Sequence, residues 1–369
     1  MSSHNLKGFN LSHHRSIPPA EWRARVQAAL TWLRRSMAAT GWQGSAHSFA
    51  LHRGWAPAYP ETTGYLIETL LDYSAILKEA PWRERALECA QWLISIQLDN
   101  GAFSALTVGN TRPSIFNTAQ ILFGLSRAAQ EWPEHSAKHD ACMQALERAA
   151  HWLLQELDDV GAWPNWAYVP GFIPSYYTRA VWGMLEANKL LKNKEIEAGM
   201  RRALGYYQTR FEENATVRDW GFWPEKPAFT HTIAYTLEGF LESALILQEP
   251  EIVNKTRAVL DHLIDVCERD GRTAGWYDQH WKGNHRFVCC TGNAQLSILC
   301  RRFWEITGEA RYHSAQHAFL FEILDYQSNS WLLGLRGAFP GSVPVWGPYL
   351  PFRYPNWGVK FFLEALKEL

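Results

Sequence analysis

The chain has 369 residues, of which 47% are hydrophobic and 20% are charged, and its formal net charge at pH 7 is −1. This composition is sufficient for a large globular core, and the nearly neutral net charge gives no general attraction for nucleic acid or an anionic membrane. No stretch approaches the roughly 18 consecutive apolar residues of a membrane-spanning helix, so no membrane span is predicted.

Residues 1–16 are polar and contain no apolar segment of the kind found in signal peptides. We therefore expect a polar leader over these residues, a single domain over residues 17–369 and a cytoplasmic location. The six cysteines lack the spacing of a disulfide framework and fall within helical patterns, so buried, reduced thiols are expected. The sequence leaves the oligomeric state open.

A short pattern recurs six times along the chain. In each copy, a loop rich in Gly and aromatic residues leads to a Thr or Asn at the start of an apolar helical stretch. The copies are 54 to 65 residues apart, counted between Thr63, Thr118, Thr178, Thr232, Thr291 and Asn356. Self-similarity at a regular spacing is the sequence signature of a repeat architecture.

Each copy contains two predicted helices. The first has one charged face, and the second is apolar on nearly every side. In chain order, the predicted pairs are 17–41 and 61–78, 82–97 and 113–130, 140–156 and 174–191, 194–211 and 229–247, 251–268 and 289–306, and 310–326 and 355–367. Strands are expected only as small hairpins in the connecting loops and at Trp331–Leu335.

The two kinds of helix together predict the fold. A helix with one charged face is half-buried, whereas a helix that is apolar on every side is buried on every side. Six buried helices inside six half-buried ones predict an all-α protein, a single (α/α)6 toroid. All inner helices then point the same way, so the loops before them line one face. The helix N-termini at this face favour the binding of anionic groups.

The residues of these loops point to a carbohydrate. Aromatic rings stack on the C–H faces of sugars, while carboxylate, amide, imidazole and guanidinium groups bind the ring edges. We predict that the loops bind an oligo- or polysaccharide, with acidic and lipid-linked glycans among the candidates, and no nucleic acid. The predicted binding residues are Trp55, Tyr59, Arg112, Trp163, Trp166, Tyr176, Arg179, Trp220, Trp223, Trp276, His280, His285, Asn293, Trp346 and Arg353.

Three carboxylates are candidates for acid/base catalysis. Glu61 stands at the start of the first inner helix, where it serves either as a proton donor and acceptor or as a first-turn acid that complements the helix dipole. Asp219 and Asp278 each flank a Gly-Trp pair. Either of them, paired with Glu61, would give the two carboxylates of a glycoside hydrolase, and the alternative for each is a residue that caps its own loop.

A second set of residues suits elimination or epimerisation of a uronate. Tyr176 or Tyr177 with His231 would form the acid/base pair, and Arg179 or Arg353 would hold the sugar carboxylate. A buried His or Arg on an inner helix needs a polar surrounding, because burial of charge is costly. We therefore expect both types of residue to face a polar cavity.

Residues 278–290 contain several residue types that bind zinc. They lack a CxxC pair and an HExxH motif, so the spacing does not support a metal site. No metal and no cofactor is predicted.

Three stretches carry a resemblance to a known family. Residues 59–65, 290–295 and 341–362 resemble VpsJ-type polysaccharide biosynthesis proteins, which are encoded in bacterial exopolysaccharide and surface-glycan gene clusters. The resemblance implies a pathway rather than a reaction. The expected fold is also similar to the six-hairpin toroids of glycoside hydrolases, polysaccharide lyases and sugar epimerases. Residues 289–293 resemble part of the zinc motif of β-L-arabinofuranosidases, but the Glu and further Cys of that motif are not recognisable.

We therefore expect a glycan-processing enzyme that acts by acid/base chemistry as a hydrolase, a lyase or an epimerase. The alternative is a glycan-binding module without catalysis, which serves an assembly complex. A terpene cyclase or prenyltransferase-like enzyme is less favoured, because the sequence has no DxDD or DDxxD cluster.

Overall fold

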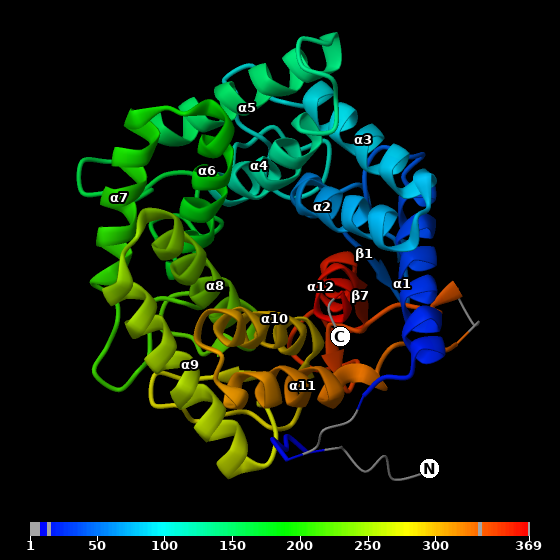
Figure 1. Cartoon of the computed structure of the whole chain (residues 1–369), viewed down its shortest axis with the longest axis vertical. Coiled ribbons are helices and arrows are strands. Elements are labelled where there is room, and N and C mark those ends of the chain that lie inside the picture. The colour runs from blue at the N-terminus through cyan, green and yellow to red at the C-terminus, as the bar shows by residue number, and fades with distance from the viewer. Residues whose placement is uncertain (1–7, 13–15, 331–333, 368–369) are drawn as a thin grey trace.

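The computed structural model describes residues 8–12, 16–330 and 334–367. Over these residues the chain forms two concentric rings of helices, and the prediction of an (α/α)6 toroid is confirmed (Figure 1). The inner helices are α2 (Pro60–Leu77), α4 (Ile115–Ala129), α6 (Thr178–Leu191), α8 (Thr230–Leu247), α10 (Cys290–Thr307) and α12 (Asn356–Leu366). The outer helices are α1 (Pro19–Ala39), α3 (Ala80–Ser95), α5 (Ala137–Gln155), α7 (Lys194–Gln208), α9 (Pro250–Asp270) and α11 (Ala310–Leu324).

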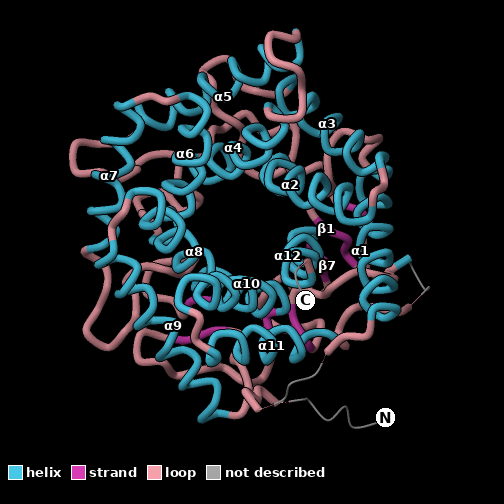
Figure 2. The backbone as a smooth tube through the Cα atoms, in the orientation of Figure 1, coloured by secondary structure: helices cyan, strands magenta, loops and turns pink. Residues whose placement is uncertain are grey.

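Short strands tie the loops together at the N-terminal ends of the inner helices (Figure 2). In one sheet, β1 (Ser48–Ala50) pairs with β2 (Gly54–Trp55) and with β7 (Arg353–Pro355). Because β1 precedes the first inner helix and β7 precedes the last, their pairing closes the ring. The other pairs are β3 (Ala228–Phe229) with β4 (Trp276–Tyr277) and β5 (Val288–Cys289) with β6 (Ser342–Val343). Residues 331–333 of the expected hairpin at Trp331–Leu335 lie outside the described residues.

Three of the repeated residues, Thr63, Thr118 and Asn356, hold these loops against the inner helices. The Thr63 hydroxyl accepts a hydrogen bond from the Ser45 N–H at 2.9 Å, and the Thr118 hydroxyl accepts one from the Phe103 N–H at 2.9 Å. In the last copy, the Asn356 amide donates to the Ala46 carbonyl. In these three copies the side chain thus satisfies loop backbone groups that would otherwise be buried without a partner.

The inner helices α2 and α4 approach each other through glycine. A Cβ added at Gly124 would lie 1.9 Å from the carbonyl oxygen of Gly64. We expect Gly124→Ala to lower the free energy of unfolding by about 1–3 kcal/mol, because it overpacks a close contact. The control is Gly205→Ala on α7, where an added Cβ has no heavy atom within 4 Å. That change should be neutral or stabilising by up to about 1 kcal/mol. Equal losses in denaturant unfolding would contradict the packing argument.

Part of the predicted leader lies against the toroid. The ring of Phe9 is 4.7 Å from that of Phe319, and the Phe9 N–H donates to the Gly271 carbonyl at 2.7 Å. Within the described part of the chain, no helix combines the length and the apolar character needed to cross a membrane.

Candidate functional site

A cavity of about 620 Å³ opens at the N-terminal ends of the inner helices, a volume within the ~300–1,000 Å³ common for small-molecule sites. Its wall is largely aromatic. The imidazole of His47 lies 4.8 Å from the Trp357 ring, measured between centroids. The imidazole of His231 lies 4.2 Å from Tyr235 and 5.4 Å from Tyr349. Such rings give a sugar apolar faces to stack on, and polar groups among them bind its edges.

Glu61 is the single carboxyl group among the described residues that line this cavity. Its side chain lies in the first turn of α2, only 7% of the residue is exposed, and the Tyr59 hydroxyl donates a hydrogen bond to it. Burial raises the pKa of Glu61 to about 7, against the lowering effects of the Tyr59 hydrogen bond and the Arg179 charge. Both protonation states are therefore populated near neutral pH, as a general acid or base requires.

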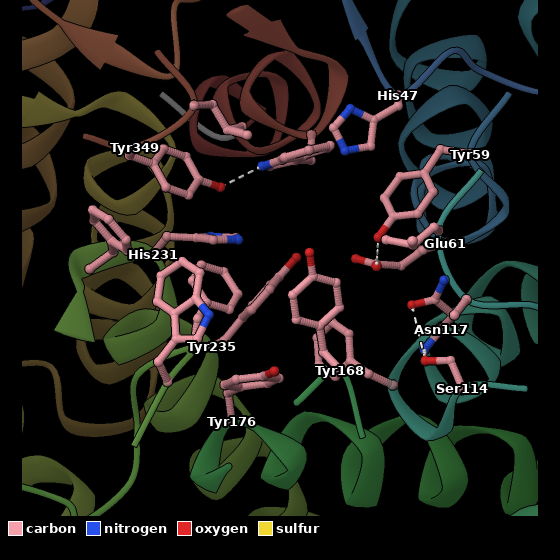
Figure 3. A pocket seen from close by; sticks show the side chains of 18 of the residues that line it. His47, Tyr59, Glu61, Ser114, Asn117, Tyr168, Tyr176, His231, Tyr235 and Tyr349 are labelled. Carbon is pink, nitrogen blue, oxygen red and sulfur yellow. Dashed lines mark hydrogen bonds between the residues drawn. The ribbon is translucent and has the colours of Figure 1, made fainter. Parts of the chain in front are cut away.

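Of the histidines that line the cavity, His231 and His47 are kept in the neutral form by burial. His231, in the first turn of α8, projects into the cavity from the wall opposite Glu61 (Figure 3). Burial lowers the pKa of His231 to about 3, and its Nδ1 lies 2.6 Å from Oε1 of Gln295. For His47, burial and the Arg353 charge lower the pKa to about 4. A neutral imidazole has one nitrogen free to accept a proton.

Two guanidinium groups give the cavity its positive charge. Arg112 and Arg353 line it, and neither forms an ion pair with a carboxylate among the described residues. Arg112 donates to the Ala167 carbonyl at 2.8 Å. The charge of Arg353 contributes to the lowered pKa of His47. Because guanidinium groups bind carboxylates in a bidentate manner, the site suits an anionic ligand.

Many of the predicted site residues converge on this cavity. Those that line it are Tyr59, Glu61, Arg112, Trp166, Tyr176, Tyr177, Trp223, His231 and Arg353. They come from loops and helix starts that are far apart in the chain, so the expected basin at the N-termini of the inner helices is present.

Both predicted aspartates lie elsewhere. Asp219 and Asp278 line a neighbouring groove of about 1100 Å³ together with Trp220 and His280, and Trp223 borders both the groove and the cavity. The Asp219 carboxylate is 3.5 Å from the Arg210 guanidinium. Oδ1 of Asp278 accepts the N–H groups of residues 280 and 282 at 2.8 and 2.9 Å, so this carboxylate caps its own loop.

Two other predicted binding residues, Trp163 and Asn293, are parts of the framework. Trp163 is fully buried and donates to the Leu153 carbonyl at 2.8 Å, and Asn293 donates to the Glu322 carboxylate at 2.8 Å. The predicted binding residues that line neither the cavity nor the groove are Trp55, Trp163, Arg179, Trp276, His285, Asn293 and Trp346.

Arg179 lies inside the barrel rather than on the cavity wall. It forms an ion pair with Glu238 of α8, and its Nε donates to Oε1 of Gln120 at 2.8 Å. Gln295 of α10 in turn donates to Glu238 at 3.2 Å. This polar belt therefore joins four inner helices. Arg179 and Glu238 also line a smaller cavity of about 350 Å³ toward the C-terminal ends of the inner helices.

Some residues of the site were not among the predicted ones. Tyr235 lines the cavity one helical turn after His231, so its spacing on the same helix face was a usable signal. Tyr168 projects into the cavity from a loop (Figure 3), where no periodicity indicates a direction. Gln295 and Glu238 lie within apolar helices, and nothing in the sequence shows which inner helices face each other.

The cysteines are not arranged as metal ligands in the described part of the chain, where no three His, Cys, Asp or Glu residues gather to hold a metal. Cys289 and Cys290 are buried, and burial raises the pKa of Cys289 to about 11. A thiol of this kind stays protonated at neutral pH, whereas metals bind the thiolate.

No protein-family model and no curated protein sequence matches the chain. Solved structures do match. An unsaturated glucuronyl hydrolase specific for heparin has a TM-score of 0.74 at 13% identity, over 94% of this chain and 96% of its own. An unsaturated glucuronyl hydrolase from Bacillus sp., responsible for glycosaminoglycan degradation, has a TM-score of 0.70 at 15% identity, over 94% of this chain and 96% of its own. The cellobiose 2-epimerase from Bacillus thermoamylovorans has a TM-score of 0.69 at 10% identity, over 95% of this chain and 99% of its own. At these identities the similarity shows a shared fold.

Proposed function

We propose that the cavity transfers protons to and from a sugar unit that carries a carboxylate, in a lyase- or epimerase-type reaction on a glycan. The observation that carries the proposal is the pairing across one cavity of Glu61, with a pKa of about 7, and the neutral imidazole of His231. A base and an acid on opposite walls can act on opposite faces of one sugar ring. Arg112 and Arg353, which form no ion pair with a carboxylate among the described residues, support the acidic sugar.

The proposed reaction begins with removal of the proton at C5, the carbon next to the carboxylate. His231 accepts this proton, and the electron pair of the broken C–H bond moves into the carboxylate. Burial is the main cause of the pKa of about 3 for His231, and the anionic sugar bound beside the ring raises that pKa and stabilises the imidazolium that forms. Arg353 and Arg112 stabilise the added negative charge, because fixed cations in a partly dry site strongly stabilise negative charge that develops during the reaction. In epimerisation, Glu61 then delivers a proton to the other face of C5. In elimination, the C4–O bond breaks instead and Glu61 protonates the departing oxygen.

The cavity fits this chemistry better than ordinary glycoside hydrolysis. Retaining and inverting hydrolases generally use two carboxyl groups that flank one glycosidic bond. Among the described residues that line the cavity, Glu61 has no second carboxyl group opposite it. The structurally similar proteins include two glucuronyl hydrolases and an epimerase by their names. They support a carbohydrate substrate, and the uronate in two of the names agrees with the positive charge of the site.

The biological setting is part of the proposal. The resemblance to VpsJ-type proteins supports a role in bacterial exopolysaccharide or surface-glycan biosynthesis, with processing in the cytoplasm and a lipid-linked intermediate among the candidate substrates. Glycan binding without turnover is the competing proposal, since the aromatic wall would serve either role.

Isotope exchange tests the reaction. The protein is incubated in D₂O with oligomers of glucuronate, galacturonate or mannuronate, and with hyaluronan fragments, and the products are examined by NMR and mass spectrometry. We expect deuterium at C5 if the reaction is epimerisation. If it is elimination, we expect near-ultraviolet absorbance of a C4–C5 unsaturated product, which has no hydrogen at C5. Chain cleavage without deuterium or absorbance would support hydrolysis and contradict the proposal. Binding without exchange, absorbance or cleavage would favour the glycan-binding module.

A further inference from the structure

The imidazole of His231 is held from behind by one amide. Only 4% of His231 is exposed, and its Nδ1 lies 2.6 Å from Oε1 of Gln295, which is itself fully buried. An imidazole in its neutral form carries hydrogen on one nitrogen and a lone pair on the other. Whether the Gln295 atom facing Nδ1 donates or accepts a hydrogen bond therefore decides which nitrogen of His231 can accept a proton.

The orientation of the Gln295 amide follows from its second contact. Its nitrogen lies 3.2 Å from Oε2 of Glu238. That same carboxylate oxygen accepts a hydrogen bond from Nη1 of Arg179, and guanidinium groups have donors only. While Glu238 is ionised beside Arg179, both of its oxygens are acceptors only, so the NH₂ group of Gln295 points toward Oε2. The amide oxygen then faces His231 and accepts a hydrogen bond from Nδ1–H.

The contacts behind Glu238 fix the whole chain of hydrogen bonds. Arg179 is 3% exposed, and its Nε donates to Gln120 at 2.8 Å. The guanidinium carbon also lies 4.7 Å from the centre of the Tyr235 ring and 5.0 Å from that of Trp182. With two of its nitrogens hydrogen-bonded and aromatic rings packed against it, the guanidinium group has little freedom to rotate. Glu238 and Gln295 are therefore held in one arrangement.

We propose that Gln295 is a positioning residue that fixes His231 in the tautomer with hydrogen on Nδ1, so that Nε2 is the atom that accepts a proton from the sugar. Nε2 is the ring nitrogen remaining for the cavity that His231 lines (Figure 3). The role of Nε2 in turnover rests on the proposed function, whereas the tautomer does not. Without the amide acceptor, no hydrogen bond would favour this tautomer, and the buried Nδ1–H would lack a partner.

The tautomer can be measured without any substrate. The full-length protein is labelled with ¹⁵N-histidine, and long-range proton–nitrogen NMR spectra are recorded near pH 7. The signals of His231 are identified by their loss in His231→Phe. We expect wild-type His231 to show hydrogen on Nδ1 and none on Nε2, and Gln295→Leu to show a mixture or the other tautomer. A wild-type ring with hydrogen on Nε2, or an unchanged ring in Gln295→Leu, would overturn the proposal.

Two further variants control for structural damage. Gln327→Leu removes another buried amide, whose nitrogen donates to the Arg25 carbonyl at 2.9 Å outside the polar belt, and it should leave the His231 signals unchanged. Gln295→Glu retains an acceptor for Nδ1–H and should retain the hydrogen on Nδ1. If Gln295→Leu does not fold, the wild-type spectrum still decides the tautomer.

Kinetics then connect the tautomer to turnover on a uronate oligomer that shows C5 exchange. We expect Gln295→Leu to lower kcat about 10- to 100-fold, a part of the ~10²–10⁴-fold that a positioned base contributes, with KM changed less than about twofold. In a His231→Ala background the same substitution should have no further effect. A lower kcat that persists in that background would contradict action through His231. If no glycan is turned over, the proposed function fails while the NMR result stands.

Discussion

Glu61→Gln should abolish most catalysis and, at the same time, make the protein more stable at alkaline pH. The catalytic loss is expected to be about 10²- to 10⁴-fold in kcat, the usual contribution of a general acid or base. Glutamine can still accept the hydrogen bond from Tyr59, so the loss reports the missing proton rather than a missing contact. The measurement, under single-turnover conditions, is the rate of deuterium incorporation at C5 for epimerisation or the rate of near-ultraviolet absorbance gain for elimination.

The stability gain follows from the pKa of Glu61. Its pKa is about 7 in the folded protein against an ordinary 4.5, with burial as the main cause. Between these pH values the folded state binds more protons at Glu61 than the unfolded state, so this group lowers stability as pH rises. At about 1.4 kcal/mol per pKa unit, the variant should gain about 3 kcal/mol over wild type between pH 5 and pH 8.5. Denaturant unfolding at the two pH values measures it.

The residues around Glu61 are the same in wild type and in Glu61→Gln, so they do not produce the pH-dependent difference in stability between the two. The hydroxyl groups of Tyr59 and Tyr65 and the Arg179 charge lower the pKa of Glu61, and burial outweighs them. The matched control is Glu147→Gln on the exposed side of α5, which should show no pH-dependent gain. A gain for Glu61→Gln that is the same at pH 5 and pH 8.5 would show that the carboxyl group is not protonated on folding.

The sequence was sufficient for the helices and their arrangement, because the two burial patterns each permit few packings. Every predicted helix pair is present within a few residues of its expected ends. The largest shift is at α6, expected from residue 174, where Ser175–Tyr177 forms a 3-10 turn before the helix begins. Helix ends depend on local hydrogen bonds that hydrophobic periodicity does not report.

The site was only partly predictable, for a geometric reason. Glu61 and His231 lie in the first turns of inner helices, so the common direction of those helices brings them to one cavity. Asp219 and Asp278 lie in long loops, and the path of a loop is not set by the repeat. The hydrogen bonds between Gln295 and Glu238 depend on which inner helices are neighbours and at what height, which a helical period does not encode.

Arg179→Met should be among the most destabilising single substitutions in the barrel, with a loss of about 3–5 kcal/mol. This is the usual cost of removing one partner of a buried ion pair, because the other charge is left buried without compensation. Arg179 is 3% exposed and Glu238 is 5% exposed. The substitution also removes the donor to Gln120 at 2.8 Å. Thermal and denaturant unfolding at neutral pH measure the loss.

The double variant Arg179→Met with Glu238→Met separates stability from function. Replacing both buried charges by apolar side chains of similar size is often neutral or stabilising, so most of the loss should be recovered. Gln295, however, then lacks the acceptor that orients its amide, so we expect kcat to remain about tenfold or more below wild type even though the fold is restored. A double variant that is stable and fully active would show that the belt only fills the barrel. One that is as unstable as Arg179→Met would show that the contacts of Arg179 beyond Glu238, with Gln120 and the surrounding rings, set its contribution.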